Sequence, residues 1–188
     1  MKALLILLIP AWLFAPVNSS KKWIVHDYNQ APFLRWWSFQ SRMEGLYSNH
    51  SKDNGGETMR GITIATYKRL TGKSRAKFLK MDANEAQKIA FTHFWKPIAK
   101  FQDERLNTLF VSAFWGGGGY QLVKDVQRML NITVDGILGE MTILAANESG
   151  PELFHKLLRC RVRYLKGCWN YPEFKHGWQK SIDFMNEL

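Results

Sequence analysis

Apolar side chains recur at helical spacing along most of this chain, and this pattern constrains the fold more than any other feature. In each such segment the apolar residues fall three or four positions apart, so a helix would gather them on one face. These segments are residues 32–43, 62–70, 82–97, 101–115, 122–130, 141–145, 151–166 and 172–187. Hydrophobic residues make up 46% of the 188, enough for a packed core. We therefore predict a mainly α-helical protein.

Two glycine-rich stretches interrupt the helical segments. Residues 45–61 are polar, and Asn54-Gly55-Gly56 is typical of a turn, so we expect a loop or short hairpin there. The four consecutive glycines at 116–119 predict a joint. A phosphate-binding loop is a poor interpretation of this joint, because no Gly-Lys-Ser or Gly-Lys-Thr follows it.

The first 20 residues have the three parts of a secretory signal. Lys2 precedes an apolar run that ends at Phe14, and a short tail leads to Ser19 and Ser20, where we expect cleavage. A membrane anchor is the alternative, but a span needs about 20 apolar residues. This run is shorter, and Pro10 interrupts it. We therefore expect a secreted or periplasmic protein without a stable membrane span.

The net charge of +10 predicts loose binding to polyanions. Nucleic acid, anionic membranes and cell walls rich in carboxylate or phosphate all fit, because net charge steers association without identifying the partner. Export favours the wall, and no helix-turn-helix or ribonucleoprotein signature supports specific binding of nucleic acid. Four cations would share one face of the predicted helix 151–166, which is either a solvated face or a contact with the wall: Lys156, Arg159, Arg163 and Lys166.

Cys160 and Cys168 are expected to pack as free thiols. Their spacing in a predicted helix separates the two Cα atoms by roughly 12 Å, beyond the limit of roughly 7 Å for a disulfide. A disulfide would require the chain to bend at Gly167. The histidines and cysteines show no metal-site spacing, and no cofactor is implied.

Glu44, directly after the predicted helix 32–43, is the candidate for acid chemistry. Cleavage of a glycosidic bond needs a carboxylic acid that stays protonated near neutral pH, and a second group that stabilises the cationic sugar or orients water. Apolar neighbours such as Trp37 would raise the pKa of Glu44, because a buried carboxyl group ionises less readily. Asp53, in a polar turn, would stay ionised, and Thr58 could hold a water molecule.

Each of these residues also has an ordinary structural interpretation. A glutamate at a helix end is usually solvated, and Asp53 before Asn-Gly-Gly is a common turn residue. Aromatic faces pack against sugar rings, so Trp37, Tyr47 and Trp95 are candidates for contacting a glycan. Trp115 and Trp178 are expected in the core.

The segment around Glu44 resembles the signature of glycoside hydrolase family 108. The residues that carry the resemblance are Glu44-Gly45-Leu46-Tyr47, then Asp53-Asn54-Gly55-Gly56-Glu57-Thr58, then Gly61-Ile62-Thr63. Glu44 falls on the family's catalytic glutamate, and Leu46 stands where the family has a second glycine. The spacing of Glu44, Asp53 and Thr58 is also close to that of phage-type lysozymes.

The resemblance extends into the second half of the chain. The stretch from Val126 to Leu130, followed by Val134-Asp135-Gly136-Ile137-Leu138-Gly139 and Thr142, is similar to the predicted peptidoglycan-binding region attached to that family. Residues 174–178, Phe-Lys-His-Gly-Trp, look like its closing helix. The resemblance implies a lysozyme-like catalytic region over residues 21–119 and a small helical region over 120–188.

Together, these observations predict a monomeric N-acetylmuramidase. Such an enzyme cuts the bond between N-acetylmuramic acid and N-acetylglucosamine in bacterial peptidoglycan, and this bond preference comes from the resemblance. A catalytically silent wall-binding or secretion-accessory protein is the alternative, with Leu46 having ended turnover.

Overall fold

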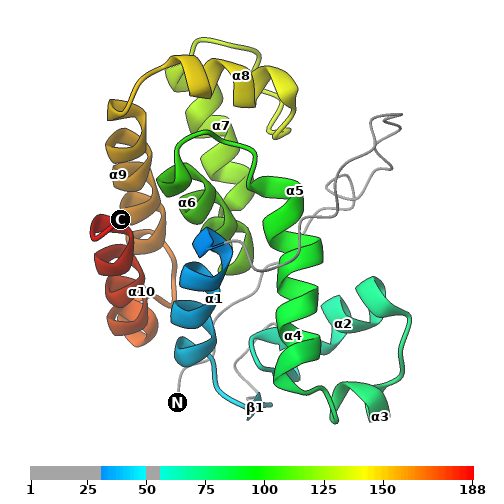
Figure 1. Cartoon of the computed structure of the whole chain (residues 1–188). Coiled ribbons are helices and arrows are strands. Elements are labelled where there is room, and N and C mark those ends of the chain that lie inside the picture. The colour runs from blue at the N-terminus through cyan, green and yellow to red at the C-terminus, as the bar shows by residue number, and fades with distance from the viewer. Residues whose placement is uncertain (1–30, 50–55) are drawn as a thin grey trace, which may run out of the picture.

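The computed structural model describes residues 31–49 and 56–188, and it is mainly helical, as predicted. A small antiparallel sheet in the order β1-β2-β3 follows the first helix (Figure 1). Its strands are β1 (Tyr47–Ser48), β2 (Thr58–Met59) and β3 (Ile62–Thr63). The helices are α1 (Ala31–Met43), α2 (Ile64–Thr71), α3 (Arg75–Phe78), α4 (Ala83–Ala90), α5 (Lys96–Ile98), α6 (Glu104–Trp115), α7 (Gly119–Met129), α8 (Glu140–Glu148), α9 (Glu152–Lys166) and α10 (Tyr171–Asn186), with a π-helical segment, Phe91–Trp95, between α4 and α5.

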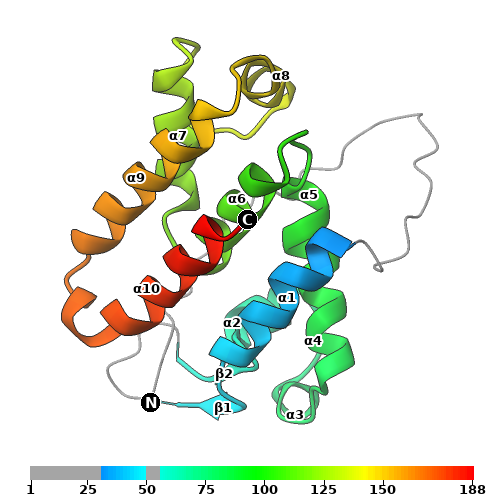
Figure 2. The same cartoon turned by 60° about the vertical axis from the view of Figure 1, so that its left-hand side comes forward.

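The helix α6 forms the centre of the core. Every residue of α6 from Leu106 to Trp115 is buried except Asn107, which is half-buried. The helix contacts α1, α5, α7, α9 and α10. A helix that is apolar all round must be enclosed by other helices. The sheet lies at one end of the molecule, close to the end of α1, and α8 lies at the other end (Figures 1 and 2).

Polar caps set several helix boundaries that apolar spacing alone misplaces. The predicted helix 62–70 begins at Ile64, because Ile62 and Thr63 form β3 and the Thr63 hydroxyl accepts a hydrogen bond from the Thr66 amide. The predicted helix 101–115 begins at Glu104, after the Asp103 cap. These differences arise because a side-chain acceptor satisfies amides that have no partner within the helix.

Asp82 and Glu85 have the spacing of a capping box, but only half of the box is formed. The Asp82 carboxylate accepts the Glu85 amide at 2.7 Å and starts α4. The Glu85 carboxylate instead accepts hydrogen bonds from the Tyr67 hydroxyl and from Lys73 Nζ. The helical path also continues past the predicted end, because Pro97 lies in the first turn of α5, where a missing amide hydrogen has little cost.

The glycine joint lets the chain turn sharply between α6 and α7. Gly117 and Gly118 have φ values of +86° and +87°, a region that other residues rarely adopt. A Cβ atom on Gly118 would lie 2.4 Å from the Tyr164 ring. Arg161 is buried in α9 and donates a hydrogen bond to the Gly117 carbonyl, so the joint is fixed against α9.

Gln127 holds the connection between α7 and α8. Its amide group is buried and donates to the Asp135 carboxylate at 2.7 Å, and its carbonyl accepts the Gly136 amide at 2.8 Å. Gly136, with φ +76°, lies against the Tyr120 ring, where a Cβ atom would be 2.5 Å away. The Asp-Gly motif of this region therefore has a structural role in the described chain.

The structure also describes the two cysteines and the four cations that the sequence analysis singled out in and near α9. Cys160 and Cys168 are free and half-buried. The four cations predicted to share a face of α9 are all exposed. Among the helices of residues 31–49 and 56–188, none is long and apolar enough to cross a membrane.

Candidate active site

Glu44 immediately follows α1, and its amide still donates to the Gln40 carbonyl at 3.2 Å. The last turn of the helix therefore fixes the backbone of Glu44, while its side chain leaves the regular helix. The residue as a whole is half-buried. This position suits an acid that must be enclosed and must also meet a substrate.

Two side chains donate hydrogen bonds to the same oxygen of this carboxyl group. Gln40 Nε2 lies 2.7 Å from Glu44 Oε1, and Trp115 Nε1 lies 3.0 Å from it. Gln40 is one helical turn earlier in α1, whereas Trp115 is 71 positions away in α6. Both donors are buried, Gln40 at 5% and Trp115 at 0% exposure.

Gly61 lies directly against the side chain of Glu44. A Cβ atom at this position would lie 2.7 Å from both Cγ and Cδ of Glu44 and 2.9 Å from Trp115 Cζ2. Its φ of +80° is also unfavourable for other residues. The glycine that begins the Gly-Ile-Thr motif is therefore required by the close approach of Glu44.

Burial raises the pKa of Glu44, because the charged form loses its hydration. The hydrogen bonds from Trp115 and Gln40 act in the opposite direction, since they favour the carboxylate, but burial is the larger effect. No charged side chain of the described residues contributes to this shift. The direction is the one expected for a general acid that holds its proton near neutral pH.

The three aromatic residues predicted to contact a glycan have different surroundings. Trp37 is half-buried and meets Trp115 edge to face, with 5.9 Å between ring centroids, so it lies one ring away from Glu44. Tyr47 is 44% exposed on β1. Trp95 is only 2% exposed and packs against Phe33 and Trp36, which argues against a sugar contact. Its ring is part of the core between the π-helical segment and α1.

The side chain of Tyr47 is held by the ion pair of Glu57 and Arg75. The Tyr47 hydroxyl donates to Glu57 Oε1 at 2.9 Å, and Arg75 Nε donates to Glu57 Oε2 at 2.8 Å. The bonds from Arg75 and Tyr47 lower the pKa of Glu57 to about 2, so this carboxylate stays ionised. Glu57 thus links β1 to α3.

The remaining predicted residues lie along the sheet and the segment before it. Thr58 pairs with Ser48 and with Thr63, and its hydroxyl donates to the Gly56 carbonyl at 3.3 Å. Asp53 lies outside the described residues. Leu46 is 62% exposed, so it contributes little to the burial of Glu44.

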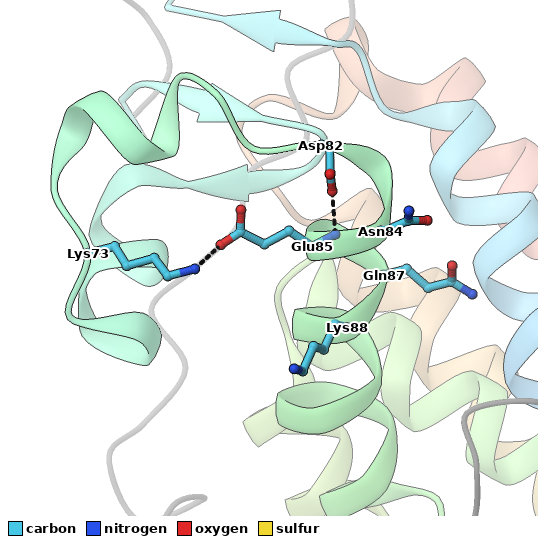
Figure 3. A pocket seen from close by; sticks show the side chains of 6 residues that line it. All are labelled: Lys73, Asp82, Asn84, Glu85, Gln87 and Lys88. Atoms are coloured by element: carbon cyan, nitrogen blue, oxygen red, sulfur yellow. Dashed lines mark hydrogen bonds and ion pairs between the residues drawn. The ribbon is translucent and has the colours of Figure 1, made fainter.

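A separate polar pocket lies over the start of α4 (Figure 3). Lys73 reaches Glu85 there at 2.6 Å. Six residues line this pocket, and none is a predicted site residue: Lys73, Asp82, Asn84, Glu85, Gln87 and Lys88. Over residues 31–49 and 56–188 we find no cluster of side chains that could hold a metal ion.

Sequence reasoning missed the roles of Gln40 and Trp115 at Glu44. Gln40 carried a partial signal, because it lies four positions before Glu44 in a predicted helix. Trp115 was correctly expected in the core, and a buried indole needs an acceptor for its N–H group. No sequence signal identified Glu44 as that acceptor.

An enclosed carboxyl group with a raised pKa, at the edge of an aromatic cluster, is an arrangement that suits a glycoside hydrolase. A family model described as Glycosyl hydrolase 108 matches residues 38–137, more than half of the chain. The chain therefore belongs to the glycosyl hydrolase 108 family. The predicted family resemblance is confirmed.

The fold is similar to that of SagA from Brucella abortus. The two structures have a TM-score of 0.70 and 24% sequence identity, over 82% of this chain and 91% of that chain. At this identity the match shows a shared fold. Among curated proteins, none matches this sequence.

The raised pKa predicts that Glu44→Gln stabilises the protein more at neutral pH than in acid. Well below pH 4.5, the ordinary pKa of the group, the carboxyl group is protonated in both the folded and the unfolded chain, so its titration costs no stability. Above that pH the unfolded chain ionises first, and the folded state loses stability until its own pKa is passed. Urea unfolding should show a larger stability advantage of Glu44→Gln over the wild type at pH 7 than at pH 4. An advantage that does not change with pH would contradict burial of the carboxyl group.

The enclosure by Gly61 predicts that Gly61→Ala displaces Glu44. The added methyl group collides with the carboxyl group, and the φ angle adds strain of about 1–3 kcal/mol. We expect lower thermal stability and a more than tenfold lower rate of glycan hydrolysis. Gly45→Ala is the matched control, since it also adjoins Glu44 but has no atom within 4 Å of its Cβ position. Equal rates for the two variants would contradict this role of Gly61.

Proposed function

We propose that this protein is a lysozyme-like N-acetylmuramidase of the bacterial cell wall, with Glu44 as its general acid. The observation that carries the proposal is the enclosed carboxyl group of Glu44 in a chain of a glycosyl hydrolase family. Burial of the carboxyl group favours its protonated form and outweighs the hydrogen bonds from Gln40 and Trp115, which favour the carboxylate. Partial exposure of the residue would let it meet a glycosidic oxygen. Proton transfer to that oxygen assists cleavage of the bond to the sugar carbon.

The second group of the reaction is proposed to be Asp53, with Thr58 holding water. Asp53 would stabilise the cationic sugar or orient the attacking water, as its place in the family motif implies. The position of Thr58 on β2, whose turn to β3 carries Gly61 against Glu44, supports a place near the acid. Trp37 and Tyr47 are the proposed sugar contacts. Tyr47 is suited to this role because Glu57 and Arg75 hold an exposed ring in place.

Glu44→Gln tests the acid directly. The amide keeps the shape of the carboxyl group and its accepting oxygen, but it cannot release a proton to the leaving oxygen. We expect reducing-end release from purified peptidoglycan to fall by at least about 100-fold, the lower range for loss of a general acid. New ends should carry N-acetylmuramic acid. Circular dichroism and melting temperature report whether each variant is folded.

The control for this test is Glu148→Gln, which removes an exposed carboxylate at the end of α8. Glu57→Gln is a poorer control, because the Glu57 carboxylate accepts bonds from Tyr47 and Arg75. If folded Glu44→Gln keeps more than about a tenth of the wild-type rate, Glu44 is not the acid. A wild-type protein that binds walls without releasing ends would favour the silent wall-binding alternative.

We also propose that the protein is exported and that α9 contacts the wall. The predicted signal at residues 1–20 and the net charge of +10 support this location. Peptidoglycan offers carboxylates, and the exposed cations of α9 give a surface that would attract them. This surface, called the α9 basic face, consists of Lys156, Arg159, Arg163 and Lys166.

Changing the four residues of the α9 basic face to glutamine should weaken pelleting with cell walls at low salt. At 1 M salt the difference should disappear, because the Debye length falls to about 3 Å. The control removes the same charge from exposed lysines on the α3–α5 side of the molecule (Figure 1): Lys77, Lys80, Lys88 and Lys100. Equal loss of binding in both variants would mean that net charge matters and the α9 basic face does not.

A further inference from the structure

The two donors at Glu44 restrict where its proton can reside. An indole N–H group has no lone pair to accept a proton or a hydrogen bond, and the amide NH₂ of glutamine likewise only donates. Both groups meet Oε1, at 3.0 Å and 2.7 Å. Their hydrogens occupy the accepting positions of that oxygen, and no hydrogen bond from a described residue reaches Oε2.

We propose that Trp115 and Gln40 are positioning residues that hold one oxygen of Glu44, Oε1, so that the other oxygen, Oε2, carries the acid proton and delivers it. This inference rests on the proposed role of Glu44 as the acid. In the reaction the Oε2 proton passes to the glycosidic oxygen while the bond from that oxygen to the sugar carbon breaks. The carboxylate left behind keeps both hydrogen bonds, which strengthen as its charge develops.

The position of Trp115 is well determined by its surroundings. Its ring is fully buried and packs edge to face against Trp36 at 5.6 Å and against Trp37 at 5.9 Å. Phe94 covers another side at 4.7 Å. The indole therefore cannot follow a rotating carboxyl group, and the Gly61 backbone lies close against Cγ and Cδ of Glu44.

The same donors limit how far burial can raise the pKa of Glu44. The elements that enclose the carboxyl group contribute Gln40 from α1, Gly61 from the β2–β3 turn and Trp115 from α6. None of these is charged, and no charged side chain of the described residues shifts this pKa. Hydrogen bonding is thus the one effect among these residues that favours the carboxylate, so removing either donor without admitting water should raise the pKa of Glu44.

The test is a ¹³C NMR titration of the Glu44 carboxyl carbon in the full chain, with its signal assigned by Glu44→Gln. The variants are Trp115→Phe and Gln40→Met, which remove one donor each. We expect each to raise the pKa of Glu44 by about one unit, a tenfold change in the ionisation equilibrium. The alkaline limb of the rate of peptidoglycan hydrolysis should move to higher pH by the same amount.

Trp36→Phe is the matched control, since it removes another fully buried indole of the same cluster. The Trp36 N–H group donates to the Ser112 hydroxyl at 3.0 Å and has no bond to Glu44. Its loss should lower stability while leaving the pKa of Glu44 unchanged. Water that fills space left by a smaller ring would lower the pKa, so the sign of the shift separates a lost donor from lost packing.

An unchanged or lowered pKa in both donor variants would overturn the inference. Gln40→Met keeps the test decisive if Trp115→Phe does not fold, because it changes side-chain volume little. The titration needs no turnover, so it remains informative if the wild-type protein does not hydrolyse peptidoglycan. In that case the proposed function fails, and the titration still shows whether Trp115 and Gln40 lower the pKa of Glu44.

Discussion

The burial of α6 is the constraint on which the rest of this structure depends. A helix with apolar side chains on nearly every face is stable only when other helices enclose it, so α1, α7, α9 and α10 all pack against it. The same enclosure leaves the indole N–H of Trp115, at the end of α6, in need of an acceptor away from water. Glu44, at the end of α1, supplies that acceptor at 3.0 Å. The packing that buries α6 therefore also fixes the position of the candidate acid.

This arrangement carries a cost in stability. Enclosing a carboxyl group favours its neutral form, so the folded chain loses free energy at pH values where the unfolded chain would be ionised. Gly61 adds a backbone conformation that side chains disfavour. Such costs are typical of sites that hold a reactive group in a fixed state, and the surrounding aromatic core offsets them. Trp115 and Gln40 reduce this loss of stability, because their hydrogen bonds to the carboxylate replace part of the hydration that burial removes.

The family motifs combine residues with different physical roles. In the first motif, Glu44 is the proposed reactive group, whereas Gly61 is there because nothing larger fits beside it. In the second half of the chain, Gln127 and Gly136 close the connection between α7 and α8 through buried hydrogen bonds. A motif residue is thus not necessarily a binding residue. Glu57, which has no distinct role in the motif analysis, fixes the exposed ring of Tyr47.

The sequence by itself determined the helical segments, the place of Glu44 after α1, the joint at 116–119 and the family, because these depend on residues close together along the chain. Apolar spacing, glycine runs and short motifs are all local patterns. Only the tertiary structure decided that Trp95 is buried, that Tyr47 is tied to Glu57 and Arg75, and that Trp115 reaches Glu44 across 71 positions. Spacing along one helix cannot fix how α1 and α6 pack, since that depends on the complementary shapes of many side chains. The packing of α1 against α6 therefore decides which oxygen of Glu44 accepts the hydrogen bonds from Gln40 and Trp115.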